Sequence, residues 1–359
     1  MSLVFPFDPD IARAATIPAR LYVDPVYLAL ETDKVFGRTW QLVGHTGQVA
    51  GTGDFLTAEV AGEGIVVVRD DDGLRAFHNV CPHRAGPVAQ GCGSRKTLQC
   101  RYHGWTFRLD GTLLRAPEME GTARFDPAAV RLWPVQVATW GPLVFVNLDA
   151  KAPPLAEVMA GVEALVSDFG VHEMRWVMRK DYELACNWKV YVDNYLEGYH
   201  LPMVHPGLHR ELDYDAYRVE PHRWFSRQVA PLREGGGAER QYVAGEGTRA
   251  EAEYLWCFPN TMLNVYLDQL QTNVVVPLGP DRTRVRFEWY ARRPPADPAT
   301  DPAWARLVAF SDEIQREDIE ICEAVQRNLR SRVYDRGRYS AAREVGVHHF
   351  HSLLHEFLT

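Results

Sequence analysis

Two short motifs, each with one cysteine and one histidine, constrain the fold of this chain more than any other feature. The first is Cys81-Pro82-His83, and the second, after sixteen intervening residues, is Cys100-Arg101-Tyr102-His103. A zinc finger normally pairs its cysteines first and its histidines later. Here each of two loops supplies one thiolate and one imidazole, which suits a two-iron cluster with both cysteines on one iron and both histidines on the other. The pattern therefore predicts a [2Fe-2S] cluster, and a zinc site is the alternative.

This ligand set is the Rieske pattern, and neighbouring positions indicate which kind of Rieske centre it is. Respiratory-type loops carry an additional disulfide, but Gly86 and Tyr102 stand where those cysteines are expected, and Trp105 replaces a potential-raising hydroxyl. With fewer hydrogen bonds to the cluster, we expect a reduction potential nearer about -150 mV than about +300 mV. Cys92 lies outside the pattern, and we expect it to be a small buried residue.

The segments around these motifs have the composition of a small antiparallel β domain. Short β-type runs are separated by glycine and aspartate turn signals such as Asp110-Gly111. The predicted strands are 41–43, 55–60, 64–68, 76–79, 98–99, 106–108 and 143–147. We expect residues 1–37 to be an N-terminal segment packing on a catalytic domain, residues 38–150 to form the Rieske [2Fe-2S] domain, and residues 151–359 to form the catalytic domain.

A second motif, within residues 193–206, predicts part of a mononuclear metal site. If residues 186–200 form a helix, Glu197 and His200 share one of its faces because they are three residues apart. Pro202 disfavours continuation of the helix, so the chain turns and brings His205 back toward His200. Two histidines need one carboxylate to complete the facial triad that is typical of non-heme Fe(II).

The third ligand is predicted from the phase of a later helix. Asp301-Pro302 is a typical helix start, and the helix is expected to continue to about Arg330. Its apolar stripe includes Ile314, Ile321, Cys322 and Val325, and Asp318 falls on that stripe. Since a carboxylate is costly to bury alone, Asp318 needs a metal or a cationic partner. An iron ligand is the preferred interpretation and a salt bridge is the alternative, whereas the other acids (Glu313, Glu317, Glu320, Glu323) are expected to point away.

The remaining segments predict an α+β catalytic domain. Residues 155–169 and the C-terminal segment read as helices, and residues 174–184, 254–258, 262–267, 271–276 and 284–290 read as strands. The glycine-rich residues 231–253 predict either a mobile loop near the active site or a plain surface loop. The histidines of His348-His349-Phe350-His351 are expected to make polar contacts on the last helix rather than to bind a metal.

Composition excludes several classes of function. The chain has 359 residues, a net charge of -8 and no long basic run, which argues against nucleic acid as the main partner. No apolar stretch approaches the roughly 20 residues that a membrane helix needs, and the first 18 residues do not resemble a secretion signal. Six scattered cysteines suggest ligands and buried thiols of a reducing compartment. A cytoplasmic enzyme is therefore the expectation.

Taken together and in this order, the two motifs resemble those of the catalytic α subunits of Rieske non-heme iron oxygenases. The resemblance covers nearly the whole chain and implies a Rieske domain plus a helix-grip (START-like) catalytic domain, with an antiparallel sheet flanked by helices. It implies one Rieske [2Fe-2S] cluster and one mononuclear non-heme Fe(II). The implied cluster ligands are Cys81, His83, Cys100 and His103, and the implied iron ligands are His200, His205 and Asp318.

The resemblance also implies roles for Glu197 and Asn194 of the motif Asn194-x-x-Glu197-x-x-His200-x4-His205. Family members form α3 or α3β3 rings, in which the cluster of one subunit supplies the iron of its neighbour. Glu197 matches the carboxylate that would link His103 of one subunit to His200 of the next. Asn194 is a further catalytic candidate, and a homotrimer with or without a β subunit is expected.

Within the family, Asn187-Trp188-Lys189, Phe258-Pro259-Asn260 and Gly337-Arg338-Tyr339 are most similar to the branch of choline, carnitine and glycine betaine monooxygenases. That branch implies hydroxylation or oxidative N-demethylation of a small molecule with O2, and a quaternary ammonium substrate held by aromatic faces. The candidate aromatic residues are Tyr195, Tyr199, Trp256, Phe258 and Tyr266.

The chain has no flavin or nicotinamide fingerprint, so a separate reductase is expected to supply electrons from NAD(P)H. Two other functions remain open from the residues alone. One is an aromatic-ring hydroxylating dioxygenase that forms cis-dihydrodiols. The other is a Rieske electron carrier without mononuclear iron.

Overall fold

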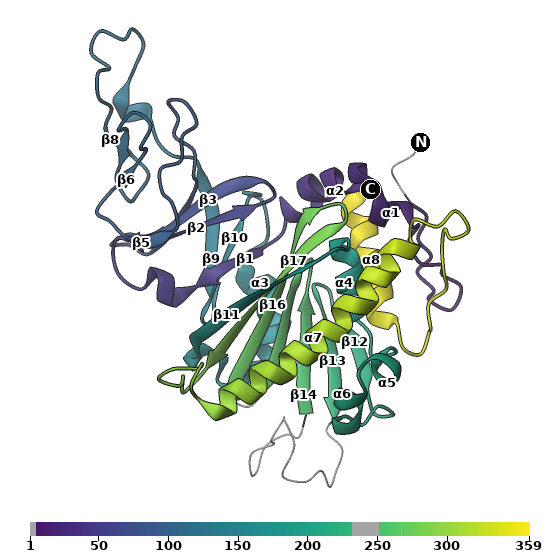
Figure 1. Ribbon diagram of the computed structural model, residues 1–359. Coiled ribbons are helices and arrows are strands. Elements are labelled where there is room, and N and C mark those ends of the chain that lie inside the picture. Colours follow the sequence, from purple (N-terminus) through teal and green to yellow (C-terminus); the bar gives the residue numbers. More distant parts are fainter. Residues whose placement is uncertain (1–4, 232–250, 267) are drawn as a thin grey trace. The chain divides into compact units, whose positions relative to one another are not determined.

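The structure is a computed structural model that describes residues 5–231, 251–266 and 268–359. Its chain divides into two compact units, residues 36–158 and residues 1–35 together with 159–359 (Figure 1). Most of the predicted loop over 231–253 lies outside the described residues, and its two ends belong to strands. Within the described part of the chain, no helix is long and apolar enough to cross a membrane.

The unit of residues 36–158 is built on antiparallel strands, as the turn-separated β runs predict. Its seven-stranded sheet has the order β1-β10-β9-β4-β3-β2-β5, and a smaller sheet has the order β6-β7-β8. The bounds are β1 (Gln41–His45), β2 (Asp54–Val60), β3 (Glu63–Arg69), β4 (Leu74–His78), β5 (Cys92–Ser94), β6 (Leu98–Gln99), β7 (Thr106–Phe107), β8 (Leu113–Arg115), β9 (Pro134–Trp140) and β10 (Leu143–Asn147). The sequence prediction missed β5, β8 and β9.

Alternation along β3 divides the interior of this unit into two apolar clusters. Ile65 and Val67 pack into one cluster, whereas Val66 and Val68 pack into the other. The second cluster also contains Cys81 and Cys100, so the cysteines of both motifs are fixed on the same core. Cys92, in contrast, is exposed, contrary to the prediction, because β5 is an edge strand that pairs only with β2.

The second unit contains a seven-stranded antiparallel sheet of order β11-β17-β16-β15-β14-β13-β12. Five strands were predicted nearly at their observed positions, and β12 and β13 were missed. The bounds are β11 (Arg175–Leu184), β12 (Arg218–Pro221), β13 (Phe225–Pro231), β14 (Glu251–Cys257), β15 (Thr261–Tyr266), β16 (Gln269–Gly279) and β17 (Arg282–Ala291).

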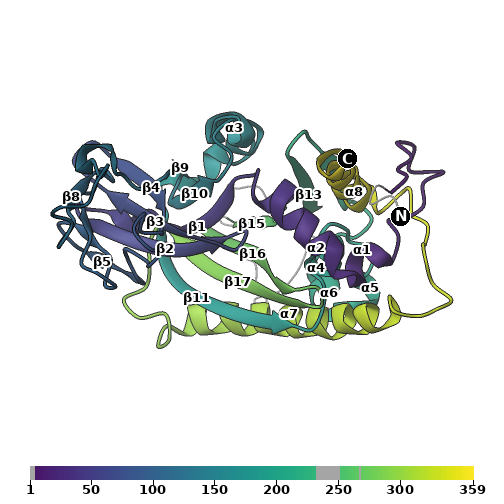
Figure 2. The ribbon, with the colours of Figure 1, turned by 90° about the horizontal axis from the view of Figure 1, so that it is seen from above.

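The long helix α7 crosses one face of this sheet (Figure 2). The helices are α1 (Arg20–Val23), α2 (Pro25–Glu31), α3 (Leu155–Val166), α4 (Trp188–Tyr195), α5 (Leu201–Val204), α6 (Pro206–Glu211), α7 (Pro302–Asn328) and α8 (Val345–Leu358). Short π- and 3₁₀-helical turns are η1 (Thr32–Phe36), η2 (Thr46–Val49), η3 (Pro127–Ala129), η4 (Ser167–Phe169) and η5 (Val171–Glu173). As predicted, Asp301 caps α7, accepting hydrogen bonds from the backbone N–H groups of Ala303 and Trp304.

The buried face of α7 differs from the predicted apolar stripe. Ile321 and Val325 are exposed, whereas Gln315 and Gln326 are buried. Both glutamines have specific partners on α4, since Gln315 accepts a hydrogen bond from the Tyr191 hydroxyl at 2.7 Å and Gln326 accepts one from the Asn187 N–H at 2.8 Å. These tertiary hydrogen bonds satisfy the amide oxygens of both glutamines and set the rotation of α7 against α4, whereas Gln315 Nε2 is buried without a hydrogen-bond partner among the described residues.

A buried ion pair anchors the first turn of α4. Lys189 and Glu31 are both fully buried, and Lys189 Nζ lies 2.6 Å from Glu31 Oε1. The indole N–H of Trp188 donates to the second carboxylate oxygen of Glu31 at 2.7 Å. Two residues of the Asn187-Trp188-Lys189 motif therefore bind one carboxylate of α2, and this fixes the helix that leads to the second histidine motif.

Candidate active site

The two cysteine-histidine motifs form short loops that follow β4 and β6. The Cys81 N–H donates to the Gly86 carbonyl at 2.8 Å, and the Cys100 N–H donates to the Trp105 carbonyl at 2.9 Å. Each loop is thus closed by backbone hydrogen bonds that begin at its own cysteine. A Cβ atom at Gly86 would lie 2.7 Å from Cys100 Sγ, so the small residue lets the first loop approach the cysteine of the second.

The side chains of these loops converge. The rings of His83 and His103 lie 4.6 Å apart, and the His83 ring is stacked on Trp105 at 4.9 Å. His83 Nδ1 is buried without a hydrogen-bond partner among the described residues, as expected for a nitrogen that is available to a metal. Two thiols on one core and two neighbouring imidazoles fit the ligand set of a Rieske cluster.

Burial raises the pKa of the Cys81 thiol, and the nearby Cys100 thiol raises it further. The backbone N–H groups of His83 and Arg84 act in the opposite direction, because they donate to the sulfur and stabilise its negative charge. The two thiols therefore share a buried position in which thiolates need a compensating positive charge, such as that of iron.

The second histidine motif begins on α4 but ends outside it. The predicted helix over 186–200 is too long, because α4 ends at Tyr195 and Pro202 lies in the first turn of the separate helix α5. Glu197 lies in the intervening turn, where its carboxylate accepts the backbone N–H groups of Tyr199 and His200. His205 returns to His200 as predicted, with their rings 5.0 Å apart, but the connection is the short helix α5 rather than a chain turn at Pro202.

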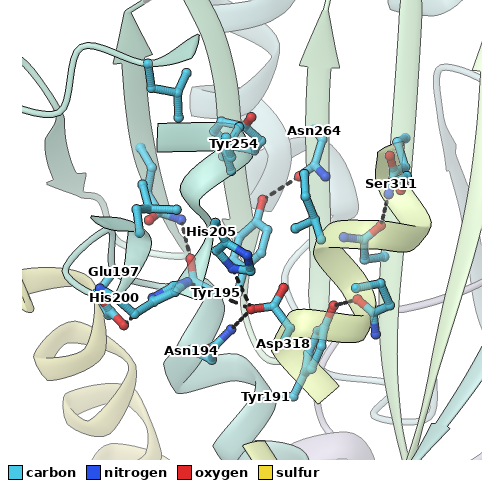
Figure 3. Close-up of a pocket in the computed structure, with 18 of the residues that line it drawn as sticks. Tyr191, Asn194, Tyr195, Glu197, His200, His205, Tyr254, Asn264, Ser311 and Asp318 are labelled. Atoms are coloured by element: carbon cyan, nitrogen blue, oxygen red, sulfur yellow. Dashed lines mark hydrogen bonds and ion pairs between the residues drawn. The ribbon is translucent and has the colours of Figure 1, made fainter. Parts of the chain in front are cut away.

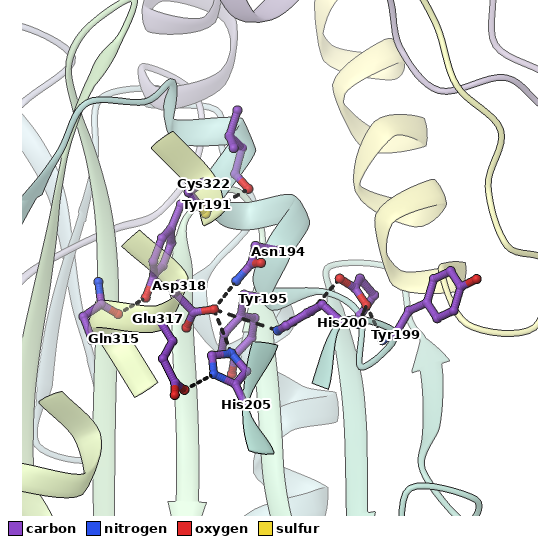
Figure 4. Close-up of polar contacts among 12 residues, drawn as sticks. Tyr191, Asn194, Tyr195, Tyr199, His200, His205, Gln315, Glu317, Asp318 and Cys322 are labelled. Atoms are coloured by element: carbon purple, nitrogen blue, oxygen red, sulfur yellow. Dashed lines mark hydrogen bonds and ion pairs between the residues drawn. The ribbon is translucent and has the colours of Figure 1, made fainter. Parts of the chain in front are cut away.

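His200, His205 and Asp318 meet at one point, as the spacing and the helical phase predict (Figure 4). One potential ligand atom from each residue lies within 4.8 Å of the other two. Asp318 Oδ1 is 2.9 Å from His205 Nε2 and 3.8 Å from His200 Nε2. Both histidines therefore turn their Nε2 atoms toward the same carboxylate, and the three residues fit a two-histidine, one-carboxylate metal site.

The Nδ1 atom of each imidazole contacts a carboxylate other than that of Asp318. His200 Nδ1 lies 2.6 Å from Glu197 Oε1, and His205 Nδ1 lies 2.6 Å from Glu317 Oε2. The prediction that Glu317 points away from the site is wrong, since α7 is rotated by its contacts with α4. The Glu317-Asp318 pair itself is a sequence signal, because neighbouring acids can reach the two nitrogens of one imidazole. Such contacts orient metal-binding histidines and increase their basicity.

Two further interactions surround Asp318. The Asn194 side-chain N–H donates to Asp318 Oδ1 at 2.6 Å, which places this predicted residue against the carboxylate. Burial disfavours the charged form of His205, but hydrogen bonds and charges of Asp318 and Glu317 together raise the pKa of this histidine. The donor set thus contains an excess of carboxylates, which a divalent cation would neutralise.

A pocket of about 110 Å³ adjoins these residues (Figure 3). Its sheet side is a row of directly paired residues on β13 to β16: Gln228 faces Tyr254, Tyr254 faces Asn264, and Asn264 faces Gln271. The opposite side is formed by α4 and α7. Tyr195 connects the two sides, since its hydroxyl donates to Asn264 Oδ1 at 2.8 Å.

Two of the five predicted pocket aromatics, Tyr195 and Tyr266, line this pocket. Tyr199 is exposed, and Trp256 and Phe258 pack on Phe350 and Phe357 of α8 instead. The sequence prediction missed four lining aromatics, Tyr191, Tyr217, Tyr254 and Phe287. Tyr254 and Phe287 belong to strands whose inward face is not readable until the register is known.

Comparisons with known protein families agree with the division into two units. Residues 39–133 match the Rieske [2Fe-2S] domain, and residues 171–359 match the catalytic domain of ring hydroxylating alpha subunits. The chain is 38% identical to chloroplastic choline monooxygenase of Arabidopsis thaliana, over 99% of this chain and 86% of that protein. It is 34% identical to the carnitine monooxygenase oxygenase subunit of Escherichia coli K12, over 95% of this chain and 93% of that protein.

Solved structures give the same picture. A quaternary ammonium Rieske monooxygenase in complex with L-carnitine superposes with a TM-score of 0.86 and 29% identity, covering 100% of both chains. Naphthalene 1,2-dioxygenase from Rhodococcus superposes with a TM-score of 0.77 over 96% of this chain and 94% of that chain, but its identity of 18% shows a common fold alone. The predicted α+β fold with a Rieske domain is confirmed.

Proposed function

This chain belongs to the Rieske non-heme iron oxygenases as a catalytic alpha subunit, and from that premise we propose that it oxidises a small quaternary ammonium compound with O2. It is an O2-dependent oxidoreductase by family. The proposed reaction is hydroxylation of a C–H bond, which leads to N-demethylation where that carbon is attached to nitrogen. The dioxygenase alternative has only a fold-level likeness in its favour, and the electron-carrier alternative conflicts with the match to the catalytic domain.

The residues that would hold the two metal groups follow from the site geometry. Cys81, His83, Cys100 and His103 would hold the Rieske cluster, and His200, His205 and Asp318 would hold the mononuclear iron. When bound, the cluster supplies electrons one at a time and the mononuclear iron supplies the open coordination positions at which O2 is activated.

The protein groups around the iron ligands position them. Glu197 and Glu317 each fix an imidazole through Nδ1, so that Nε2 faces Asp318, and Asn194 fixes the carboxylate of Asp318. With Nδ1–H donating to a carboxylate, each histidine is held in the tautomer whose Nε2 carries the lone pair. Glu197 and Asn194 are therefore proposed as residues that orient the iron ligands.

The observation that carries the substrate proposal is the aromatic lining of the pocket beside this triad. The rings of Tyr254 and Tyr266 are perpendicular, with centroids 6.3 Å apart, and they form two walls at a corner of the pocket. The face of a tyrosine ring attracts a cation although the ring carries no formal charge. A quaternary ammonium suits such a site because it has no N–H groups that need hydrogen-bond acceptors. The relatives that act on choline and carnitine have names consistent with such a substrate.

The proposed partners follow from the family. A separate NAD(P)H-dependent reductase would supply electrons, and a homotrimer, with or without a β subunit, would bring the cluster of one subunit to the iron of another. We propose that Glu197 makes this link, because its Oε1 already contacts Nδ1 of His200. For one related quaternary ammonium monooxygenase, the structure has been interpreted in terms of electron transfer between subunits.

A substrate panel tests the proposal. The enzyme, a surrogate reductase and NADH are mixed with choline, carnitine, glycine betaine, γ-butyrobetaine or naphthalene, and O2 uptake and products are measured. We expect substrate-dependent O2 uptake with a quaternary ammonium compound, coupled to a hydroxylated product or to formaldehyde. A cis-dihydrodiol from naphthalene, with no turnover of the ammonium compounds, would overturn the proposal.

A pair of variants isolates the aromatic contribution. Tyr254→Leu should raise the KM for the best ammonium substrate roughly tenfold. The change removes one cation–π contact of about 1 kcal/mol and the aromatic ring that forms one wall of the pocket. Tyr199→Leu is the matched control, since Tyr199 is exposed outside the pocket. A neutral analogue, in which carbon replaces the ammonium nitrogen, should inhibit wild type and Tyr254→Leu almost equally.

A further inference from the structure

A second group of polar residues meets at Asp193, a half-buried residue of α4 next to Asn194. We call Tyr22, Asp193, Tyr339 and His351 the Asp193 cluster. The Tyr22 hydroxyl donates to Asp193 Oδ2 at 2.6 Å, and His351 Nε2 lies 3.0 Å from Asp193 Oδ1 and 3.2 Å from the Tyr22 hydroxyl. His351 Nδ1 lies 2.7 Å from the Tyr339 hydroxyl. The two late motifs of the sequence, Gly337-Arg338-Tyr339 and His348-His349-Phe350-His351, thus meet here.

This arrangement is suited to passing a proton. His351 is 1% exposed, and both of its ring nitrogens have a partner that can give or accept a proton. An imidazole in such a position can receive a proton on one nitrogen and release it from the other. Continuous hydrogen bonds connect Tyr339 to His351, His351 to the Tyr22 hydroxyl, and Tyr22 to Asp193. His351 and Asp193 also form an ion-pair contact.

A cavity of about 270 Å³ connects this cluster with the proposed iron site. Asp193, Tyr22 and His351 lie on its wall, and so do Asn194, Glu197 and His200. A cavity of this size has room for water, and the polar side chains on its otherwise largely apolar wall can hold that water by hydrogen bonds. The rest of its wall differs from the wall of the aromatic pocket and includes Val347 of α8 and Cys322 of α7. The substrate and a proton path therefore reach the histidine site from different cavities.

We propose that the Asp193 cluster and this cavity form the route by which protons from solvent reach the oxygenation site. The inference rests on the proposed function, in which R–H, O2, two electrons and two protons give R–OH and H2O. The reductase supplies the electrons, and solvent supplies both protons. In each transfer His351 takes a proton at Nδ1 and gives one from Nε2 to the Tyr22 hydroxyl, which passes its own proton to Asp193. The ring returns to its initial protonation after its hydrogen bonds reorganise.

Other titratable groups also act on this cluster. Glu344 interacts electrostatically with Asp193, His351 and Glu197, and burial raises the pKa of the Glu344 carboxyl. The further groups whose charges interact with Asp193 or Tyr22 are Lys189, Cys322 and Tyr334. Any pH profile of a variant has to be compared with wild type for this reason.

Asp193→Asn tests the route, because it keeps the shape and removes the proton-accepting charge. We expect kcat to fall on the order of 10²-fold, as for loss of a positioned acid or base. KM and the iron and cluster contents should stay unchanged, and the solvent isotope effect on kcat should increase. Asp193→Glu should recover part of kcat. Asp312→Asn is the matched control, since this carboxylate also binds a tyrosine hydroxyl, that of Tyr182, but lies outside both cavities.

An unchanged kcat, or a lower kcat with an unchanged isotope effect, would overturn the proposal and leave the cluster a structural support. A second readout does not require turnover. With zinc at the mononuclear site and the cluster oxidised, ¹⁵N-histidine NMR should show the His351 ring N–H exchanging with solvent within seconds, and more slowly in Asp193→Asn. Protection for hours in wild type would contradict the route. Failure of every ammonium substrate would refute the proposed function without affecting this measurement.

Discussion

The two sets of histidines in this chain are held in different ways. His83 and His103 lie on short loops, contact each other and aromatic rings, and His103 is exposed. His200 and His205 are each fixed by a carboxylate at Nδ1, and His205 is 1% exposed. An exposed imidazole edge suits a group that exchanges electrons with other proteins, whereas imidazoles fixed by carboxylates suit a site that must orient O2 and a substrate. The difference matches the two roles proposed for one chain.

The two sites also differ in how the fold assembles them. The cluster loops are closed by backbone hydrogen bonds within a few residues of each cysteine. The proposed iron site instead joins residues that are 113 positions apart, His205 and Asp318, which lie at the end of α5 and on α7. The first site depends on local loop geometry, and the second depends on the packing of helices against one sheet.

The largest expected effect separates the two sites completely. Asp318→Ala removes the carboxylate of the two-histidine, one-carboxylate site. The mononuclear iron and all substrate turnover should therefore be lost while the cluster remains. Cys81→Ser should do the reverse. Iron and sulfide analysis with the visible spectrum measures both. Loss of the cluster spectrum in Asp318→Ala would mean that the two sites are not independent.

The next effect concerns stability of the catalytic unit. Glu31→Gln leaves the fully buried Lys189 without its anionic partner, which should cost about 3–5 kcal/mol of unfolding free energy. Denaturant unfolding followed by tryptophan fluorescence measures the change. The cluster spectrum should be retained up to the unfolding transition. The double variant Glu31→Gln/Lys189→Met should recover much of the loss, and a double variant as unstable as the single one would contradict the buried-charge explanation.

A smaller effect tests whether the second carboxylates matter. Glu317→Ala frees Nδ1 of His205, and removal of such a partner typically weakens metal binding by about 10–100-fold. Competition with a chelator measures the affinity for Fe(II) or for Co(II). Glu320→Ala, an exposed glutamate on the same helix, is the control and should be neutral. Equal affinities of the two variants would show that His205 needs no carboxylate, as His83 needs none.

The smallest effect is a pH dependence confined to the catalytic unit. Burial, with nearby positive charge, lowers the pKa of His349 to about 4, and its Nδ1 lies 2.8 Å from Ser226 Oγ. Between about pH 6.5 and 4, His349 is protonated in the unfolded chain but remains neutral in the folded protein. The free energy of unfolding therefore falls as the pH falls. We expect a contribution on the order of 2 kcal/mol, reduced by partial exposure of the ring. Unfolding free energies at pH 7.5, 6 and 4.5 should show a shallower decline in His349→Gln, and parallel declines would contradict the assignment.

The sequence predicted best what depends on spacing within a motif. Cys81, His83, Cys100 and His103 are recognisable because each pair lies in one loop. His205 does return to His200, although Pro202 lies in the first turn of the short helix α5 instead of breaking a helix. Asp318 was found from helical phase, although α7 proved to be rotated so that Ile321 and Val325 are exposed. The prediction of Asp318 was not affected by this rotation, because Asp318 lies near the edge of the predicted stripe.

Residues that depend on strand register were not predictable. Gln228, Tyr254, Asn264 and Gln271 form one row only because four strands pair in a particular alignment. Each polar residue in isolation looks like an outward-facing position of a half-buried strand. The contact of Glu317 with His205 was missed for a related reason, since hydrogen bonds of Gln315 and Gln326 to α4 set the rotation of α7.

The carboxylates behind the two imidazoles of the triad have a consequence for metal supply. Because Glu197 and Glu317 hold Nδ1 of His200 and His205, contacts within the protein itself orient these two donors. Two imidazoles and one carboxylate follow the general affinity order of divalent first-row metals, in which copper, zinc and nickel bind more tightly than Fe(II). If these donors hold the iron as proposed, a correctly folded chain can be filled with an inactive metal. The active fraction of a preparation is then set by which metals are available during synthesis, and exchange under anaerobic Fe(II) should restore it without refolding.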